Sequence, residues 1–207
     1  MQHSIRLFEK NHLFNLTTQI INCSEQQVKV VIDGKPIMIN AIGLTLAETI
    51  FHPQGGGQPA DKGNINDLPL LTVKEDKTQL NEQGLPTIFH VFDSAIVDIN
   101  QFKVGQEVHI QVDESYRKQC MRSHTAGHLI ADALELNPTF YPYKAKAIQG
   151  NHFPGSEYIK VILDVQPDNL DIFCEELNQA LNELIFQTLP ISITTNNNEP
   201  RHISIGK

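Results

Sequence analysis

Residues 113–138 read DESYRKQCMRSHTAGHLIADALELNP, and this stretch divides the chain into two parts. Asp113 can accept hydrogen bonds from the first amides of a helix, and Asn137, followed by proline, is a typical place for a helix to end. The stretch therefore predicts one long helix from Asp113 to about Asn137. It carries His124 and His128, whose spacing of four residues places both imidazoles on one helix face.

The chain before this helix has the pattern of β structure. Its candidate strands are short, rich in β-branched residues and separated by Gly, Pro, Asn or Asp. These candidates are residues 28–32, 36–42, 87–92 and 107–112. Residues 74–86, KEDKTQLNEQGLP, are polar, and we expect a long hairpin loop or a mobile excursion there.

A second helix is expected from about Asp168 to Leu189, where leucine and phenylalanine recur every three or four residues and form one apolar stripe. Such a stripe is more typical of core packing than of a cofactor site. Further candidate strands are residues 157–163, 191–195 and 202–205. Because the order lacks a βαβ rhythm, it predicts the α+β class. We expect a small β-barrel-like domain over residues 1–112, and an α+β domain over residues 113–207 with helices packed on an antiparallel sheet.

The composition allows a folded, soluble protein. The chain has 207 residues, of which 40% are hydrophobic, enough to bury a core. A net charge of -8 counts against a dedicated nucleic-acid binder, because such proteins are usually basic. The charges are uneven, however: residues 163–189 carry acids and no Lys or Arg. Basic residues gather around the histidines: Lys103, Arg117, Lys118, Arg122, Lys144, Lys146 and Lys160. Solvated faces explain this pattern as well as a binding surface does.

The cysteine count and the N-terminus bear on the cellular setting. Three cysteines are too few, and an odd number, for a disulfide framework. The first residues lack the apolar stretch of a signal peptide, and no apolar run is long enough to span a bilayer. We therefore expect a cytoplasmic protein without a membrane partner.

The paired histidines are candidate metal ligands. Two imidazoles four residues apart on a helix can bind one Zn²⁺ at about 2.0–2.1 Å. In the metalloprotease motif a Glu follows the first His as the general base, whereas Thr125 stands here, so that mechanism is disfavoured. The ordinary alternative is a pair of half-buried helix histidines bonded to their neighbours. Gly127 costs the helix about 1 kcal/mol relative to Ala, and it allows a ligand or another segment to come close.

A second candidate stretch is ETIFHPQGGGQPADKG, residues 48–63. Three consecutive glycines, Gly55, Gly56 and Gly57, favour positive φ and close approach of the backbone, and they uncover N–H groups. Such a loop can hold an anionic or carbonyl oxygen while Gln58 supplies a side-chain amide. An ordinary wide turn is the alternative, and on that reading Thr49 is a plain strand threonine.

The two stretches together resemble one protein family. Residues 49–63, TIFHPQGGGQPADKG, followed by residues 122–129, RSHTAGHL, are similar to the editing domain of alanyl-tRNA synthetases and to the free-standing AlaX-type trans-editing proteins. Residues 89–96, FHVFDSAI, and residues 150–163, GNHFPGSEYIKVIL, fit the same pattern. The resemblance therefore extends over essentially the whole chain.

The resemblance implies hydrolysis of the ester in tRNA(Ala) that was mischarged with serine or glycine, with the acceptor end of tRNA(Ala) as the partner. It implies Zn²⁺ as the cofactor, His124 and His128 as zinc ligands, and Thr49 and Gln58 as catalytic residues. Thr49 is expected to hydrogen-bond a serine hydroxyl that alanine lacks, a contact that discriminates strongly. The candidate substrate-binding residues are Gly55, Gly56, Gly57 and Arg122. His52 stands where the family usually has Tyr.

The family pattern continues past ISIG to a Cys-Gly-Gly-Thr-His block that supplies a second ligand pair, whereas this sequence stops at Gly206 and Lys207. Catalytic zinc sites normally use three protein ligands. We therefore expect either a shortened form or replaced ligands. His152, His202 and Cys174 are conceivable replacements, although no spacing argument supports any of them.

Two other functions stay open from the sequence. One is a non-catalytic module that binds tRNA or a protein partner and has lost half of the metal site. The other is a metal-dependent hydrolase of a small ester or amide. The salt dependence of substrate affinity distinguishes this hydrolase from a tRNA enzyme, because contacts to tRNA phosphates weaken steeply as the salt concentration rises.

Overall fold

The computed structural model describes residues 4–8, 12–32, 35–80, 84–194 and 202–205. The chain divides into two compact units. The first comprises Met1–Gly55 and Pro59–Lys118, and the second comprises Gly56–Gln58 and Gln119–Lys207. Three residues from the glycine-rich stretch therefore belong with the second unit.

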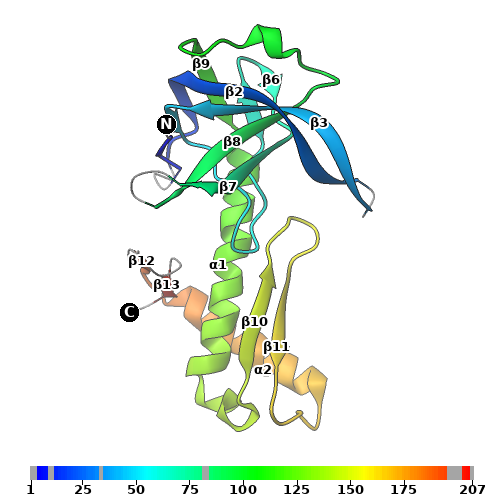
Figure 1. The fold of residues 1–207 in the computed structure, drawn as a ribbon. Coiled ribbons are helices and arrows are strands. Elements are labelled where there is room, and N and C mark those ends of the chain that lie inside the picture. Colours follow the sequence, from blue (N-terminus) through cyan, green and yellow to red (C-terminus); the bar gives the residue numbers. More distant parts are fainter. Residues whose placement is uncertain (1–3, 9–11, 33–34, 81–83, 195–201, 206–207) are drawn as a thin grey trace. The chain divides into compact units, whose positions relative to one another are not determined.

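The first unit contains an antiparallel sheet of seven strands in the order β6-β5-β9-β2-β3-β8-β7 (Figure 1). In chain order these strands are β2 (Asn15–Ile32), β3 (Lys35–Leu46), β5 (Gly63–Ile65), β6 (Leu68–Pro69), β7 (Thr72–Leu80), β8 (Pro86–Asp93) and β9 (Glu107–Val112). A separate parallel pair is formed by β1 (Ile5–Arg6) and β4 (Glu48–Thr49), and a 3-10 turn, η1 (Ile99–Gln101), precedes β9. The four strands expected from the sequence are confirmed within β2, β3, β8 and β9.

The burial pattern of these strands explains their places in the sheet. β9 alternates exposed and buried residues, as a strand does when only one of its faces covers the core. β8 has six consecutive buried residues, so both of its faces are covered. The main core contains Ile20, Leu44, Phe51 and Ile110, all without exposed surface.

The α+β class and the large antiparallel sheet are confirmed. The sheet order begins with β6 and ends with β7, and within the described residues these two strands do not pair with each other. No closed barrel is thus found in that part of the chain, and the barrel-like form of the N-terminal domain stays a prediction.

The expectation of a long loop over residues 74–86 is wrong for its first half. β7 continues to Leu80 and pairs with β8, with Lys74 opposite Phe89 and Asp76 opposite Thr87. The charged residues that suggested a loop lie on an edge strand of the sheet. Charged side chains are common there because they prevent another strand from adding to the open edge.

The second unit is built on α1 (Glu114–Leu136), whose first turns belong to the first unit. The expected cap is confirmed, since the Asp113 carboxylate accepts a hydrogen bond of 2.9 Å from the amide of Tyr116. The later elements are η2 (Pro138–Tyr143), β10 (Lys146–Asn151), β11 (Tyr158–Ile162), α2 (Leu170–Phe186), β12 (Ile191–Thr194) and β13 (His202–Ile205). β10 pairs antiparallel with β11, and β12 with β13 (Figure 1).

The apolar stripe of α2 is a core face, as expected. Phe173 and Ala180 are buried in a cluster with Leu134 of α1 and Phe140 of η2. The helix begins after Asn169, whose side chain accepts hydrogen bonds from the amides of the first turn. None of the helices in the described part of the chain is long and apolar enough to cross a membrane.

Candidate functional site

The two histidines of α1 lie together on one face of the helix. The ring centroids of His124 and His128 are 5.1 Å apart, and the ring planes differ by 21°. Both side chains are partly exposed. The helical spacing therefore has the expected geometric effect.

Gln58 of the glycine-rich stretch contacts this histidine pair within the second unit. Its Oε1 atom lies 2.9 Å from Nδ1 of His124, and the Gln58 side chain is buried. An amide oxygen only accepts hydrogen bonds, so Nδ1 carries the proton and donates it. In the neutral imidazole of His124, Nε2 then carries the lone pair.

The glycines allow the backbone to pass close to these side chains. Gly56 and Gly57 have positive φ angles of 56° and 79°. A Cβ atom on Gly56 would lie 3.6 Å from Cε1 of His124, and one on Gly57 would lie 2.5 Å from the carbonyl oxygen of Gly150. Positive φ is thus confirmed for both residues, whereas close approach of the backbone is confirmed for Gly57 alone, because 3.6 Å is an ordinary van der Waals contact. Gly55 has neither, since nothing lies within 4 Å of the position of its Cβ.

A third imidazole, that of His152, stacks on His124. Their ring centroids are 4.6 Å apart with planes 18° from parallel, and His152 is only 5% exposed. Its amide donates a hydrogen bond of 2.9 Å to the carbonyl of Gly57. The sequence offered no spacing argument for His152, because it lies on the chain after β10, far from α1. The only signal was its place in the segment GNHFPGSEYIKVIL.

The surroundings of His152 favour its neutral form. Burial lowers the pKa of this imidazole, and the nearby His128 lowers the pKa further, while a hydrogen bond to the main-chain carbonyl of Ser123 partly opposes both effects. Neutral imidazole is the form of histidine that binds metal ions.

The chemistry of these donors fits zinc, but their present arrangement is not that of a formed metal site. Imidazole nitrogens are common zinc ligands, and the Nδ1 proton of His124 is held by a neutral oxygen, as is usual for a ligating histidine. The rings, however, stand face to face. Among the described residues no group of three His, Cys, Asp or Glu side chains is arranged to hold a metal ion. Cys174 is exposed on α2, and the side chain of His202 lies outside the described residues.

Thr49 lies in the core of the first unit and has no exposed surface. Its Oγ1 atom is 2.7 Å from Nε2 of His90, and Nδ1 of His90 is 3.1 Å from the carbonyl oxygen of Leu44. A carbonyl accepts, so Nδ1 donates to Leu44 and Nε2 accepts the proton of Thr49. The amide of Phe51 donates to Thr49 Oγ1 at 3.1 Å. The hydroxyl of Thr49 therefore keeps only one acceptor position.

His90 was not among the residues singled out from the sequence. Burial lowers its pKa to about 4, against a smaller opposing effect of the hydrogen bond to Leu44. The side chain is thus neutral at physiological pH. A single histidine inside the apolar strand of residues 87–92 was the available signal.

A buried ion pair between Arg117 and Asp61 lies in the first unit, beside the residues that flank the glycine-rich stretch. Arg117 binds Asp61 through Nε and Nη2, and Nη2 also donates to the carbonyl of Ile50 at 2.6 Å. Asp61 in turn accepts from the amide of His52 at 2.5 Å. Both charged side chains are almost fully buried. The residues that lead into and out of the loop are thereby held together.

The comparisons with known proteins point in one direction, although no family model matches the chain. The alanyl-tRNA editing protein AlaX-M of Pyrococcus horikoshii is 39% identical over 101 residues, which are 49% of this chain and 42% of that protein. The alanyl-tRNA editing protein Aarsd1 of Danio rerio is 30% identical over 177 residues, 84% of this chain and 37% of that protein. The alanine–tRNA ligase of Methanococcus maripaludis is 27% identical over 177 residues, 80% of this chain and 17% of the ligase.

The chain belongs to the AlaX-type alanyl-tRNA editing family. It spans about two fifths of the length of the first curated relatives that it matches.

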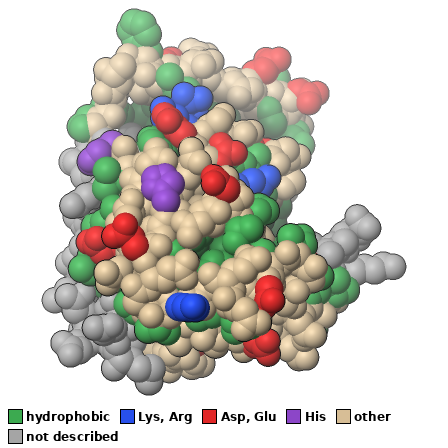
Figure 2. Space-filling model, turned by 90° about the horizontal axis from the view of Figure 1, so that it is seen from above, with side chains coloured by type: hydrophobic (Ala, Val, Ile, Leu, Met, Phe, Trp, Pro, Cys, Tyr) green, Lys and Arg blue, Asp and Glu red, His purple; other side chains and the backbone are tan. Residues whose placement is uncertain are grey.

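The sequence left open whether the basic residues near the histidines are a binding surface or solvated side chains, and several of them are engaged with acids in this alanyl-tRNA editing family member. Arg117 is buried, and Lys118 pairs with Glu114 along α1. Lys144 lies 3.8 Å from Asp164. Figure 2 looks at the molecule from above, and the few Lys and Arg side chains on that face are separated by acidic and uncharged ones. Arg122, a candidate for substrate binding, is exposed on α1 two residues before His124.

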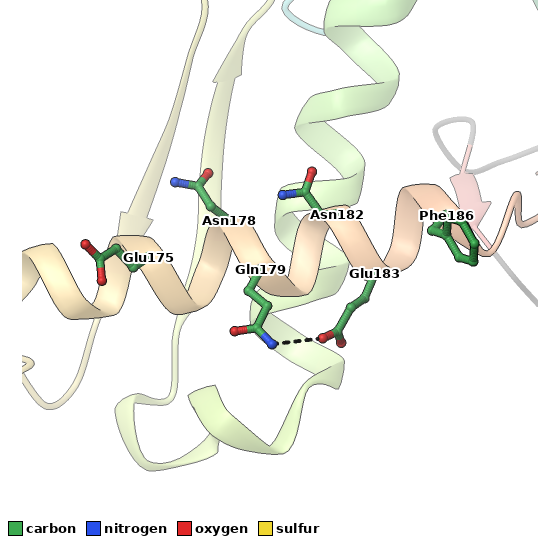
Figure 3. Close-up of a pocket in the computed structure, with 6 residues that line it drawn as sticks. All are labelled: Glu175, Asn178, Gln179, Asn182, Glu183 and Phe186. Atoms are coloured by element: carbon green, nitrogen blue, oxygen red, sulfur yellow. Dashed lines mark hydrogen bonds between the residues drawn. The ribbon is translucent and has the colours of Figure 1, made fainter.

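The family member also has an open pocket of about 550 Å³ on α2. The described residues that line it are Glu175, Asn178, Gln179, Asn182, Glu183 and Phe186 (Figure 3). Gln179 donates to Glu183 at 3.2 Å, and Phe186 is 89% exposed. None of the site residues expected from the sequence lines this pocket, so it is separate from the histidine site.

Proposed function

We propose that this chain is a trans-editing hydrolase that cleaves the ester between serine, or glycine, and tRNA(Ala). Membership in the alanyl-tRNA editing family supports the reaction class. The observation that carries the proposal for these residues is the hydrogen bond of 2.9 Å between Gln58 and His124. It joins two stretches that lie 66 positions apart in the sequence.

The same site supports zinc as the cofactor, held by Nε2 of His124 and by His128. A zinc ion bound there would supply Lewis-acid polarisation of the reacting groups or a fixed point for the acceptor end of the tRNA. The role of Gln58 is to hold the His124 ring in one tautomer and one orientation.

The glycine-rich loop would bind the reacting ester. Gly56 and Gly57 have positive φ, a backbone conformation that occurs where successive main-chain amides bind an anionic or carbonyl oxygen. Arg122, exposed on α1, is the candidate contact to a tRNA phosphate.

Discrimination against alanine would depend on Thr49. Because its proton goes to His90 and one lone pair goes to Phe51, Thr49 can only accept a further hydrogen bond. A serine hydroxyl can donate that bond and an alanine methyl cannot. Thr49 has no exposed surface in this structure, so direct contact requires the residues around it to open.

The test is deacylation of Ser-tRNA(Ala), Gly-tRNA(Ala) and Ala-tRNA(Ala) by the purified chain in the presence of Zn²⁺. We expect serine to be lost fastest and alanine slowest. His124→Ala and Gln58→Ala should lower the rate on serine, while His109→Ala, at an exposed position on β9, should leave it unchanged. Equal loss of all three amino acids at the uncatalysed rate would remove the catalytic proposal. If the chain then bound tRNA without releasing serine, the binding-module alternative would take its place.

A further inference from the structure

We propose that the outer face of the hairpin formed by β10 and β11 binds RNA, and that it contacts the backbone of the tRNA substrate through Lys146 and Lys160. This inference rests on the proposed function, because the partner is the tRNA of that reaction. It deepens that function by naming a surface for the tRNA that is separate from the histidine site.

The strand register gives the hairpin two different faces. Gly150 pairs with Ile159, and Ala147 pairs with Val161. A Cβ atom on Gly127 of α1 would lie 2.9 Å from Cδ1 of Ile159, and Val161 packs against the second core cluster, so these pairs form the inner face. Because side chains alternate along a strand, the pairs between them form the outer face. The residues of the outer face are Lys146, Gln149, Asn151, Tyr158, Lys160 and Ile162.

The outer face is exposed and combines an aromatic ring with two ammonium groups. Tyr158 and Ile162 are 50% and 52% exposed, and both lysines are exposed as well. Nε2 of Gln149 donates a hydrogen bond of 3.2 Å to the Tyr158 hydroxyl, which ties the ring to the neighbouring strand. Surfaces that bind single-stranded RNA have this composition, because the ring stacks on an unpaired base while the ammonium groups contact phosphates.

The charges on the outer face favour a polyanion as the partner. Within the described part of the chain, neither Lys146 nor Lys160 forms an ion pair. Residues 146–162 contain one carboxylate, that of Glu157, which accepts a hydrogen bond of 3.2 Å from the Ser123 hydroxyl on α1. This carboxylate therefore lies toward the inner side of the hairpin. The outer face is left with two positive charges and no negative one of its own.

The other elements of the second unit support the same placement. Residues 163–189, which include α2, carry acids and no Lys or Arg, so a phosphate backbone would be repelled there. The inner face of the hairpin, in contrast, reaches the histidine site, since a Cβ atom on Gly150 would lie 2.6 Å from Nε2 of His152. A tRNA whose acceptor end reacts at that site therefore passes beside the hairpin, where the outer face is open to it.

The experiment measures the affinity of the chain for uncharged tRNA(Ala) over a range of salt concentrations, so that binding is observed without hydrolysis. The double variant Lys146→Gln, Lys160→Gln should weaken binding by at least about tenfold at about 0.1 M salt. The slope of log affinity against log salt should become shallower by about 1.5, because each phosphate contact contributes about 0.7–0.9.

Lys144→Gln is the matched control. It makes the same change of charge just before β10, but the Lys144 ammonium lies 3.8 Å from the carboxylate of Asp164. Affinity and salt slope should stay at the wild-type values in this variant. An equal loss in the control and in the double variant would show that the overall charge, rather than the outer face, determines binding, and it would overturn the inference.

Two variants of Tyr158 test the stacking. Tyr158→Leu keeps an apolar side chain but removes the ring, and it should weaken tRNA binding by at least about fivefold. Tyr158→Phe removes only the hydroxyl that Gln149 contacts and should retain the wild-type affinity. Circular dichroism should show that all variants keep the wild-type secondary structure, as expected for changes at exposed positions. Wild-type affinity of Tyr158→Leu would overturn the stacking contact.

The outcomes separate this inference from the proposed function. On Ser-tRNA(Ala), the double variant should have a raised KM and an unchanged kcat. Wild-type tRNA affinity in the double variant would overturn the RNA surface, even if the wild-type chain releases serine. Binding that depends on both lysines, without release of serine, would overturn the editing reaction and leave the RNA surface standing. Self-association that is lost in Tyr158→Leu while tRNA affinity is unchanged would assign the face to a second copy of the chain instead.

Discussion

The Thr49 hydroxyl is held on two sides in the core of the first unit, where it donates to His90 and accepts from the amide of Phe51. Thr49→Val keeps the shape of the side chain and removes both interactions. The buried Nε2 of His90 then lacks its donor, which should cost about 1–3 kcal/mol in the free energy of unfolding. Urea denaturation followed by circular dichroism measures this cost.

Thr45 provides the matched control for that substitution. It is 2% exposed, and its buried Oγ1 atom has no hydrogen-bond partner among the residues that the structure describes. Thr45→Val should therefore be neutral or stabilising. Equal destabilisation by the two substitutions would show that loss of the hydroxyl, rather than loss of the bond to His90, determines the cost.

His90 should make stability depend on pH. Burial lowers its pKa from 6.5 to about 4, so between these values the unfolded chain binds a proton that the folded chain does not. Stability is therefore complete above pH 6.5 and falls as the pH decreases toward 4, by up to about 3 kcal/mol from this residue. Unfolding free energies at about pH 7 and about pH 5 should differ less in His90→Gln than in the wild type. His109→Gln should keep the wild-type difference, and identical slopes in all three proteins would contradict the assignment.

For single residues, the sequence predicts which side chains are neighbours through local spacing. It does not predict contacts between side chains that lie far apart along the chain. His124 and His128 share a face because a helix repeats every 3.6 residues. The partners of His90 and His124 cannot be found in that way, because Leu44 and Gln58 lie 46 and 66 positions away along the chain. His152 reaches the same site only through the hairpin of β10 and β11.

Among the elements, α2 depends on its N-terminal cap. The Asn169 side chain accepts hydrogen bonds from the amides of Asp171 and Ile172, at 2.9 Å and 3.2 Å. Asn169→Ala should lower the free energy of unfolding by about 1 kcal/mol, because these amides lose their acceptor. Asn178→Ala, at an exposed position in the middle of the same helix, should be neutral or slightly stabilising. Thermal melting distinguishes the two, and a reversed order would exclude the cap as the cause.

Elements with a strong local pattern were predicted well, and those without one were not. α1 has the Asp113 cap, α2 has a cap and an apolar stripe, and β9 alternates buried and exposed residues. The prediction for β7 was wrong because its sequence carries the charged residues of an edge strand, and loops carry similar residues. Whether a polar strand lies at an edge is decided by its neighbours in the sheet.

At the scale of the whole molecule, the buried pair of Asp61 and Arg117 joins chain segments 56 positions apart. Asp61→Ala leaves the Arg117 charge buried without its partner and should cost about 3–5 kcal/mol in unfolding free energy. Glu114→Ala removes the exposed ion pair with Lys118 and should cost no more than about 0.5 kcal/mol. Chemical denaturation measures the free energy of unfolding of the two variants. A small effect of Asp61→Ala would show that the ion pair does not stabilise the segments beside the glycine-rich stretch.

The division of the molecule was harder to predict than its class. A change from strands to helices suggested a boundary at residue 112, whereas the compact units change at Lys118, inside α1, and again on either side of Gly56–Gln58. Sequence patterns show where element types change. They do not show that three residues of an early loop fold with a later part of the chain.

Because Gly56–Gln58 belong to the second unit, fragments of the protein lose part of the histidine site. A fragment that starts at residue 113 would contain His124, His128 and His152 but not Gln58, which orients His124, nor the Gly57 carbonyl that accepts from the His152 amide. No single contiguous fragment therefore corresponds to the second unit. The fragment from residue 113 would need the missing tripeptide supplied in trans or grafted through a designed connection.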